Sequence, residues 1–100
     1  MAKKTANIEI NGKKFKITEL DSLRARDAIL LLQDQENKVE NRRKVLKFLL
    51  ANVEMDFGDG RTAALDTEEI INQNLSLPEL LKLEEEANKL TFGFLLGGGI

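Results

Sequence analysis

The segment from residue 6 to residue 18 places the strongest constraint on the fold. Two short runs in this segment alternate apolar with polar residues, and the pair Asn11-Gly12 separates them. Asn and Gly both tolerate the positive φ angles of a type I′ turn, so the arrangement predicts a β-hairpin. The apolar side chains share one face of this hairpin, and they are Ile8, Ile10, Phe15 and Ile17. An isolated hairpin is marginal in water, so that face must pack against the rest of the chain.

The next residues predict two helices. Alanines and leucines at helical spacing indicate a helix at about 21–35, with Asp21 or Ser22 as its N-cap. A second apolar stripe indicates a helix at about 37–53. Neither Gly nor Pro marks the boundary between them, so one long bent helix is the alternative.

A second pair of strands and a short helix are expected next. Apolar and acidic residues alternate at 53–57, a glycine-containing turn follows at 58–60, and the segment 61–64 can return as a second short strand. Asp66 or Thr67 then caps a short helix. The sequence therefore predicts strands on both sides of the first two helices.

The last helix has a clear start. Ser76 and Glu79 have the spacing of a capping box, and Pro78 lies in the first turn, so the helix begins near residue 77. Its apolar residues step by three and four, which is typical of a helix that packs on one neighbour. They are Leu80, Leu83, Ala87, Leu90 and Phe94.

These elements together describe one α+β domain that spans residues 1–100. Its N-terminal β-hairpin, at about 6–18, packs on a small bundle of about four helices. The helical body covers about 21–92, and an apolar, glycine-rich tail covers 93–100. A chain of 100 residues has room for one modest hydrophobic core.

The composition excludes several kinds of chemistry. The chain contains no His, Cys, Trp or Tyr, so disulfides, thiolate nucleophiles, Cys/His zinc sites and imidazole bases cannot form. Acidic residues surround the glycines at 58 and 60, but their spacing does not fit an EF-hand loop. We therefore expect a protein that is not an enzyme, with no catalytic residue, no cofactor and no metal.

Charge is distributed unevenly along the chain. The first fifty residues carry 12 basic and 7 acidic side chains, and the last fifty carry 3 and 10. These runs can be solvated faces, or the basic half can meet the acidic half of a neighbour in a homo-oligomer. Nucleic acid is a third partner, although the overall net charge of −2 disfavours it. The basic residues that are candidates for partner contact are Arg42, Arg43 and Lys47.

Apolar residues crowd the C-terminal end. The foremost candidates for partner contact are Phe92, Phe94, Leu95 and Leu96. They can form an exposed apolar patch, or the tail can fold back onto the core. The apolar segment 90–100 is too short to span a bilayer, and no secretory signal is evident at the N-terminus. We therefore expect a cytoplasmic protein without a membrane partner.

The layout as a whole resembles the tail assembly chaperones of long-tailed bacteriophages. The features that carry the likeness are the alternating hairpin at 7–17, the leucine-rich helical segments at 27–32 and 76–81, and the glycine-rich end. The resemblance implies a non-structural protein of the host bacterial cytoplasm. Such a protein binds the tape measure protein, and often the tail tube protein, and prevents premature tail polymerisation.

The resemblance also implies a programmed ribosomal frameshift near the end of the gene. Gly97–Gly99 require three GGN codons, which suits a slippery site, although a flexible chain end explains the same glycines. Two other functions stay open at this point. The chain can be a small nucleic-acid-binding regulator that uses the basic segment 38–47, or a structural subunit of a virion assembly.

Overall fold

The computed structural model of the protein describes residues 3–96, with side chains as far as position 93. Within this part of the chain, four strands and four helices form an α+β fold, as predicted. The elements follow in the order β1 (Thr5–Ile10), β2 (Lys13–Thr18), α1 (Ser22–Gln33), α2 (Lys38–Ala51), β3 (Val53–Asp56), β4 (Thr62–Ala64), α3 (Glu68–Asn74) and α4 (Leu77–Leu96).

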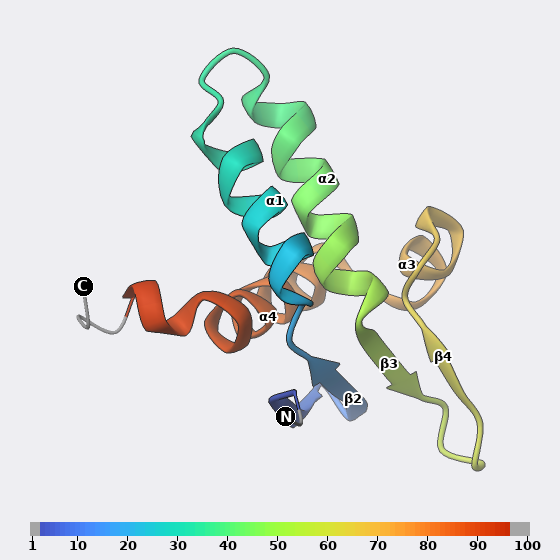
Figure 1. The fold of residues 1–100 in the computed structure, drawn as a ribbon. Coiled ribbons are helices and arrows are strands. Elements are labelled where there is room, and N and C mark those ends of the chain that lie inside the picture. The colour runs from blue at the N-terminus through green and yellow to red at the C-terminus, as the bar shows by residue number, and fades with distance from the viewer. Residues whose placement is uncertain (1–2, 97–100) are drawn as a thin grey trace.

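The predicted N-terminal hairpin is the first half of a larger sheet. Asn11 and Gly12 have φ angles of 51° and 80°, as a type I′ turn requires, and Ile10 pairs with Lys13 across it. The strand order is β1-β2-β3-β4, and all neighbours are antiparallel. The second pair of strands therefore extends the hairpin, while α1 and α2 are inserted between β2 and β3 (Figure 1).

The two faces of the sheet differ because side chains alternate along each strand. Phe15, Ile17, Val53 and Met55 are buried on one face and belong to the hydrophobic core. The polar residues between them on β1, β2 and β3 are exposed on the other face. Only one face of the sheet thus packs on the helices.

The segment between α1 and α2 is a polar turn, so the chain forms a helical hairpin instead of one bent helix. The carboxylate of Asp34 accepts hydrogen bonds from the backbone N–H of Glu36 (2.9 Å), from Nδ2 of Asn37 (3.2 Å) and from Nδ2 of Asn41 (3.1 Å). The Asn41 amide also donates to the carbonyl of Leu31 at 3.1 Å, near the end of α1. Side chains that bond to nearby backbone groups compete with helix continuation, which explains a break without Gly or Pro.

The helix starts agree in part with the predictions. Thr67 caps α3 through its side chain, which accepts a hydrogen bond from the N–H of Ile70 at 3.2 Å. Asp21 stands at the N-cap position of α1, but its side chain makes no capping bond and instead pairs with Lys3. Helix α4 begins with the predicted capping box.

Helix α4 crosses the base of the helical hairpin and contacts α2 on one side and β1 and β2 on another (Figure 1). Its buried residues Leu83 and Ala87 join the core formed by Leu50 and the sheet. Gly93 does not end the helix, which continues to Leu96, so the first residues of the predicted tail are helical. Among the described residues, no helix combines the length and the apolar character that crossing a membrane requires.

A buried carboxylate links α4 to the N-terminal hairpin. Oε1 of Glu79 accepts hydrogen bonds from Nζ of Lys13 and from the N–H of Ser76, both at 2.8 Å. Oε2 of Glu79 accepts from Nδ2 of Asn11 at 3.1 Å. The Lys13 ammonium, with these other donors, lowers the pKa of Glu79 to about 2. Lys13 also donates to the carbonyl of Asn74, so one ion pair holds the β1–β2 turn against the junction of α3 and α4.

Candidate interaction surfaces

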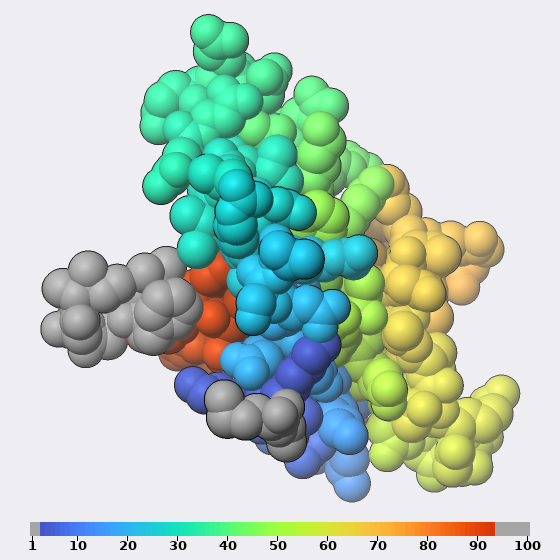
Figure 2. Space-filling view, viewed as in Figure 1, coloured from blue at the N-terminus to red at the C-terminus, as the bar shows by residue number. Residues whose placement is uncertain are grey.

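The distal half of the helical hairpin projects beyond the core (Figures 1 and 2). The buried residues of α2 nearest the sheet are apolar, but the buried side chain of the distal half is the amide of Asn41. Leu32 at the end of α1 is exposed, and Val39 at the start of α2 is 86% exposed. Large apolar side chains are therefore presented to solvent at the tip, where they add nothing to the core.

A hollow of about 390 Å³ lies at this tip. We call it the tip hollow. Apolar surface from Leu31 and Leu32 and positive charge from Lys38 and Arg42 meet in it, together with Gln35. An apolar wall beside two cations suits a partner segment that carries both leucine-like and acidic side chains.

Arg42 is the only one of the three basic candidates that lines the tip hollow. Arg43 and Lys47 point toward α3 and pair with the carboxylate of Glu68, with 2.7 Å between Lys47 Nζ and Glu68 Oε2. Hydrogen bonds from Lys47 and then Arg43 lower the pKa of Glu68, so the contact keeps its charge to a more acidic pH than an isolated glutamate would. The structure thus brings Arg43 and Lys47 together and separates Arg42 from them.

A shallow groove lies beneath the Arg43–Glu68–Lys47 cluster. It has a volume of about 240 Å³ and runs between α2, α3 and the start of α4. Leu46, Leu50, Ile71 and Leu80 form its apolar part. Because the cations at its rim are already paired with Glu68, this basic face of α2 offers less free positive charge than the sequence indicates. That pairing weighs against the use of α2 as a nucleic-acid-binding helix.

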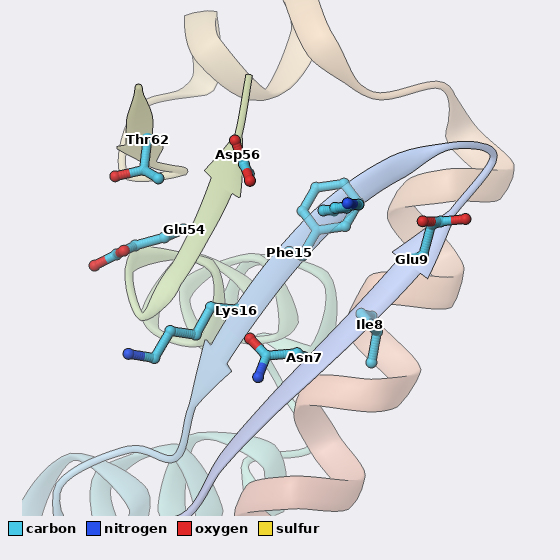
Figure 3. A pocket seen from close by; sticks show the side chains of 9 residues that line it. Asn7, Ile8, Glu9, Phe15, Lys16, Glu54, Asp56 and Thr62 are labelled. Carbon is cyan, nitrogen blue, oxygen red and sulfur yellow. The ribbon is translucent and has the colours of Figure 1, made fainter. Parts of the chain in front are cut away.

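The open face of the sheet carries a third hollow, of about 450 Å³ (Figure 3). Charges alternate in sign across neighbouring strands, because Lys14 pairs with Glu9 on one side and with Asp56 on the other. The neighbouring row places Lys16 between Asn7 and Glu54. Such a surface is nearly balanced in charge, and Ile8 and Phe15 add apolar surface to the lining of the hollow.

The C-terminal candidates have separate locations. Phe92 is 7% exposed and belongs to the core, so in the isolated chain it is not available to a partner. Phe94, Leu95 and Leu96 lie in the last turns of α4, and their side chains are outside the described part of the structure. The glycines of the proposed slippery site, Gly97–Gly99, also lie outside it.

The titratable groups of the described residues act as ion-pair and hydrogen-bond partners. Each carboxyl group whose pKa clearly departs from its ordinary value has a lowered pKa, and these groups are Asp34, Asp59, Glu68, Glu79 and Glu85. Hydrogen bonds from neighbouring donors are the main cause in each case. No group of three or more acidic side chains in residues 3–93 is arranged to hold a metal ion.

Sequence reasoning missed most of the tip hollow. The run Leu30-Leu31-Leu32 could have indicated it, because three adjacent residues of a helix point in directions about 100° apart. At least one leucine of such a run therefore points away from the core.

Comparison of the chain with protein-family models, with curated proteins and with solved structures gives no match.

Proposed function

We propose that this protein is a non-enzymatic assembly chaperone of a bacteriophage tail. In this proposal it acts in the cytoplasm of the infected bacterium and binds the tape measure protein, the tail tube protein or both, so that the tail does not polymerise early. The observation that carries the proposal is the tip hollow, where Leu32 and the nearby Val39 are exposed beside Lys38 and Arg42.

An assembly chaperone must offer apolar surface that its own core does not use. The tip meets this requirement through Leu32 and Val39, which are exposed on a two-helix arm and lie outside the hydrophobic core. The adjacent cations select acidic segments over basic ones and accelerate encounter with them. The proposed mechanism is therefore reversible covering of apolar, acidic client segments by the end of the helical hairpin.

The test is co-expression with a tape measure protein of a long-tailed bacteriophage. The variant Leu32→Ser/Val39→Ser removes the exposed apolar side chains near the tip hollow. Two anchor residues of an interface commonly contribute enough that their loss lowers binding about tenfold. We expect soluble client recovered with the chaperone to fall by about that factor, as measured by affinity purification and densitometry.

The matched control is Leu77→Ser/Leu81→Ser, which removes two exposed leucines from α4. This control should leave client recovery unchanged. Equal loss in both variants, or no loss in either, would show that the tip is not the client site. Retention of the protein in purified finished particles would instead assign it as a structural subunit.

A further inference from the structure

The turn of the N-terminal hairpin contains a chemically reactive pair of residues. Gly12 follows Asn11, and this is the one Asn-Gly pair in the sequence. Asparagine is a labile side chain, because the backbone nitrogen of the next residue can attack its amide carbon. A glycine in that position favours the attack, since no Cβ obstructs the approach of the backbone. Both residues are exposed and the space beside Gly12 is open, so water reaches the turn.

The structure ties the amide of Asn11 to a buried carboxylate. Nδ2 of Asn11 donates to Oε2 of Glu79 at 3.1 Å, and Glu79 is 5% exposed. The backbone beside this amide is also fixed, because the pairing of Ile10 with Lys13 closes the type I′ turn. The attack requires the amide carbon of Asn11 to rotate toward the Gly12 nitrogen. The hydrogen bond to Glu79 restrains that rotation.

We propose that Asn11 is a deamidation site, that its hydrogen bond to Glu79 protects it, and that the acidic product cannot restore this contact. In the reaction the Gly12 nitrogen forms a bond to Cγ of Asn11, the bond from Cγ to Nδ2 breaks, and ammonia leaves with the proton of the Gly12 N–H. Water then hydrolyses the cyclic imide. Opening at Cγ gives aspartate in a normal chain, and opening at the backbone carbonyl of residue 11 gives isoaspartate. Water is the co-reactant, and nothing is oxidised or reduced.

Either product weakens the contact between the hairpin turn and α4. Aspartate at position 11 has no side-chain N–H to donate and places a second carboxylate beside Glu79, where Lys13 supplies one ammonium. Isoaspartate adds a carbon atom to the backbone of a two-residue turn, which disturbs the pairing of Ile10 with Lys13. Glu79 also accepts from the N–H of Ser76, so the junction of α3 and α4 loses part of its link to the turn.

Peptide mapping by mass spectrometry measures the conversion of Asn11 in the purified chain during storage at neutral pH. Glu79→Ala removes the acceptor and should make the conversion about tenfold faster, because a hydrogen bond to a charged group is lost. Asn37 is the control within the same chain, since it is exposed and also donates to a carboxylate but precedes Lys38 instead of a glycine. It should stay unconverted. Equal conversion of Asn37 and Asn11, or equal rates in the parent and Glu79→Ala, would overturn the proposal.

Asn41→Ala separates local opening of the turn from unfolding of the whole chain. This change weakens the helical hairpin and leaves the bond between Asn11 and Glu79 in place. Conversion of Asn11 should therefore stay within about threefold of the parent rate. If Asn41→Ala accelerated the reaction as much as Glu79→Ala, the bond to Glu79 would not be what protects the site. Should circular dichroism show that Glu79→Ala does not fold, Glu79→Gln replaces it, and its uncharged acceptor should give conversion about threefold faster than in the parent.

Asn11→Asp reproduces one product, and Asn11→Gly is its matched control. Glycine removes the amide without adding charge and accepts the positive φ of this position. Asn11→Asp should melt about 4 °C below Asn11→Gly at pH 7, and the difference should close as the pH falls below about 4, where aspartate takes up a proton. Equal melting temperatures at pH 7 would contradict the proposed effect of the product on Glu79. These measurements use the purified chain alone, so their outcome is independent of client binding.

Discussion

Glu79 joins three segments of the chain through its carboxylate, and its environment makes folding depend on pH. The pKa of Glu79 falls from its ordinary value near 4.5 to about 2 in the folded chain, first because Lys13 donates to it. The folded state therefore binds fewer protons than the unfolded state between these values, and stability from this site is lost as pH falls from 4.5 toward 2. Glu79→Gln keeps an acceptor oxygen but removes the charge.

We expect Glu79→Gln to lower the melting temperature at pH 7, with a difference from the parent that shrinks as pH approaches 2. Circular dichroism melts across this pH range measure the effect. The control is Glu54→Gln on the open sheet face, which removes an exposed carboxylate and should lower the melting temperature at pH 7 by less than Glu79→Gln does. A constant difference for Glu79→Gln at every pH would show that packing, not charge, holds this site.

The local hydrogen bonds of Glu79 could be predicted from the sequence, but its long-range bonds could not. The local spacing of Ser76 and Glu79 predicted the capping box, and both of its hydrogen bonds are confirmed. The bonds from Asn11 and Lys13 join residues 68 and 66 positions apart, so no local pattern contains them. Only the fold shows that Lys13 faces a buried carboxylate.

At the level of elements, the helical hairpin depends on Asn41. This amide is 4% exposed and donates to both the end of α1 and the turn that follows it. Asn41→Ala removes these donors from the partly buried Leu31 carbonyl and from the Asp34 carboxylate, which should cost about 1–3 kcal/mol of unfolding free energy. Urea denaturation measures the loss, and hydrogen exchange should show faster exchange of amides in residues 31–41.

Asn37→Ala is the control for this prediction. Asn37 also donates to Asp34, but it is exposed, so the loss should stay below about 1 kcal/mol. If both variants lost equal stability, burial of Asn41 would not be what stabilises the distal half of the arm. If neither variant lost stability, the polar turn would not be what maintains the break between the helices.

The elements themselves were largely predictable, but their assembly was not. Hydrophobic periodicity and turn residues indicated both strand pairs and all four helices within one or a few residues of their observed ends. The pairing of β2 with β3 joins strands on either side of the helical hairpin, and local periodicity does not specify such non-local contacts. The second hairpin could therefore be predicted from the sequence, but its addition to the first hairpin in one sheet could not.

At the scale of the whole molecule, ion pairs within one chain neutralise part of the charge difference between its basic first half and its acidic second half. The basic helix α2 meets the acidic start of α3 through Glu68, so these charges of opposite halves pair inside the fold. The sequence grouped Arg42, Arg43 and Lys47 as one surface. Arg42 and Arg43 are adjacent on a helix and so point about 100° apart, which is why the fold divides the group.

The position of Phe92 decides how the C-terminal tail can be tested. A chain that ends at Thr91 loses a core side chain, whereas one that ends at Gly93 keeps it and removes Phe94, Leu95 and Leu96. Loss of a buried Phe typically costs about 3 kcal/mol, so the shorter chain should unfold more easily than the longer one by about that amount. Denaturant unfolding of the two chains measures the difference.

Client binding by the chain that ends at Gly93 then tests the tail without damage to the core. If the tip hollow is the client site, this chain should recover as much soluble client as the full protein. Loss of client by this chain, with its stability intact, would assign binding to the residues after Gly93 instead. Equal stability of the two truncated chains would contradict the core role of Phe92, because removing a buried aromatic ring leaves its neighbours without contacts.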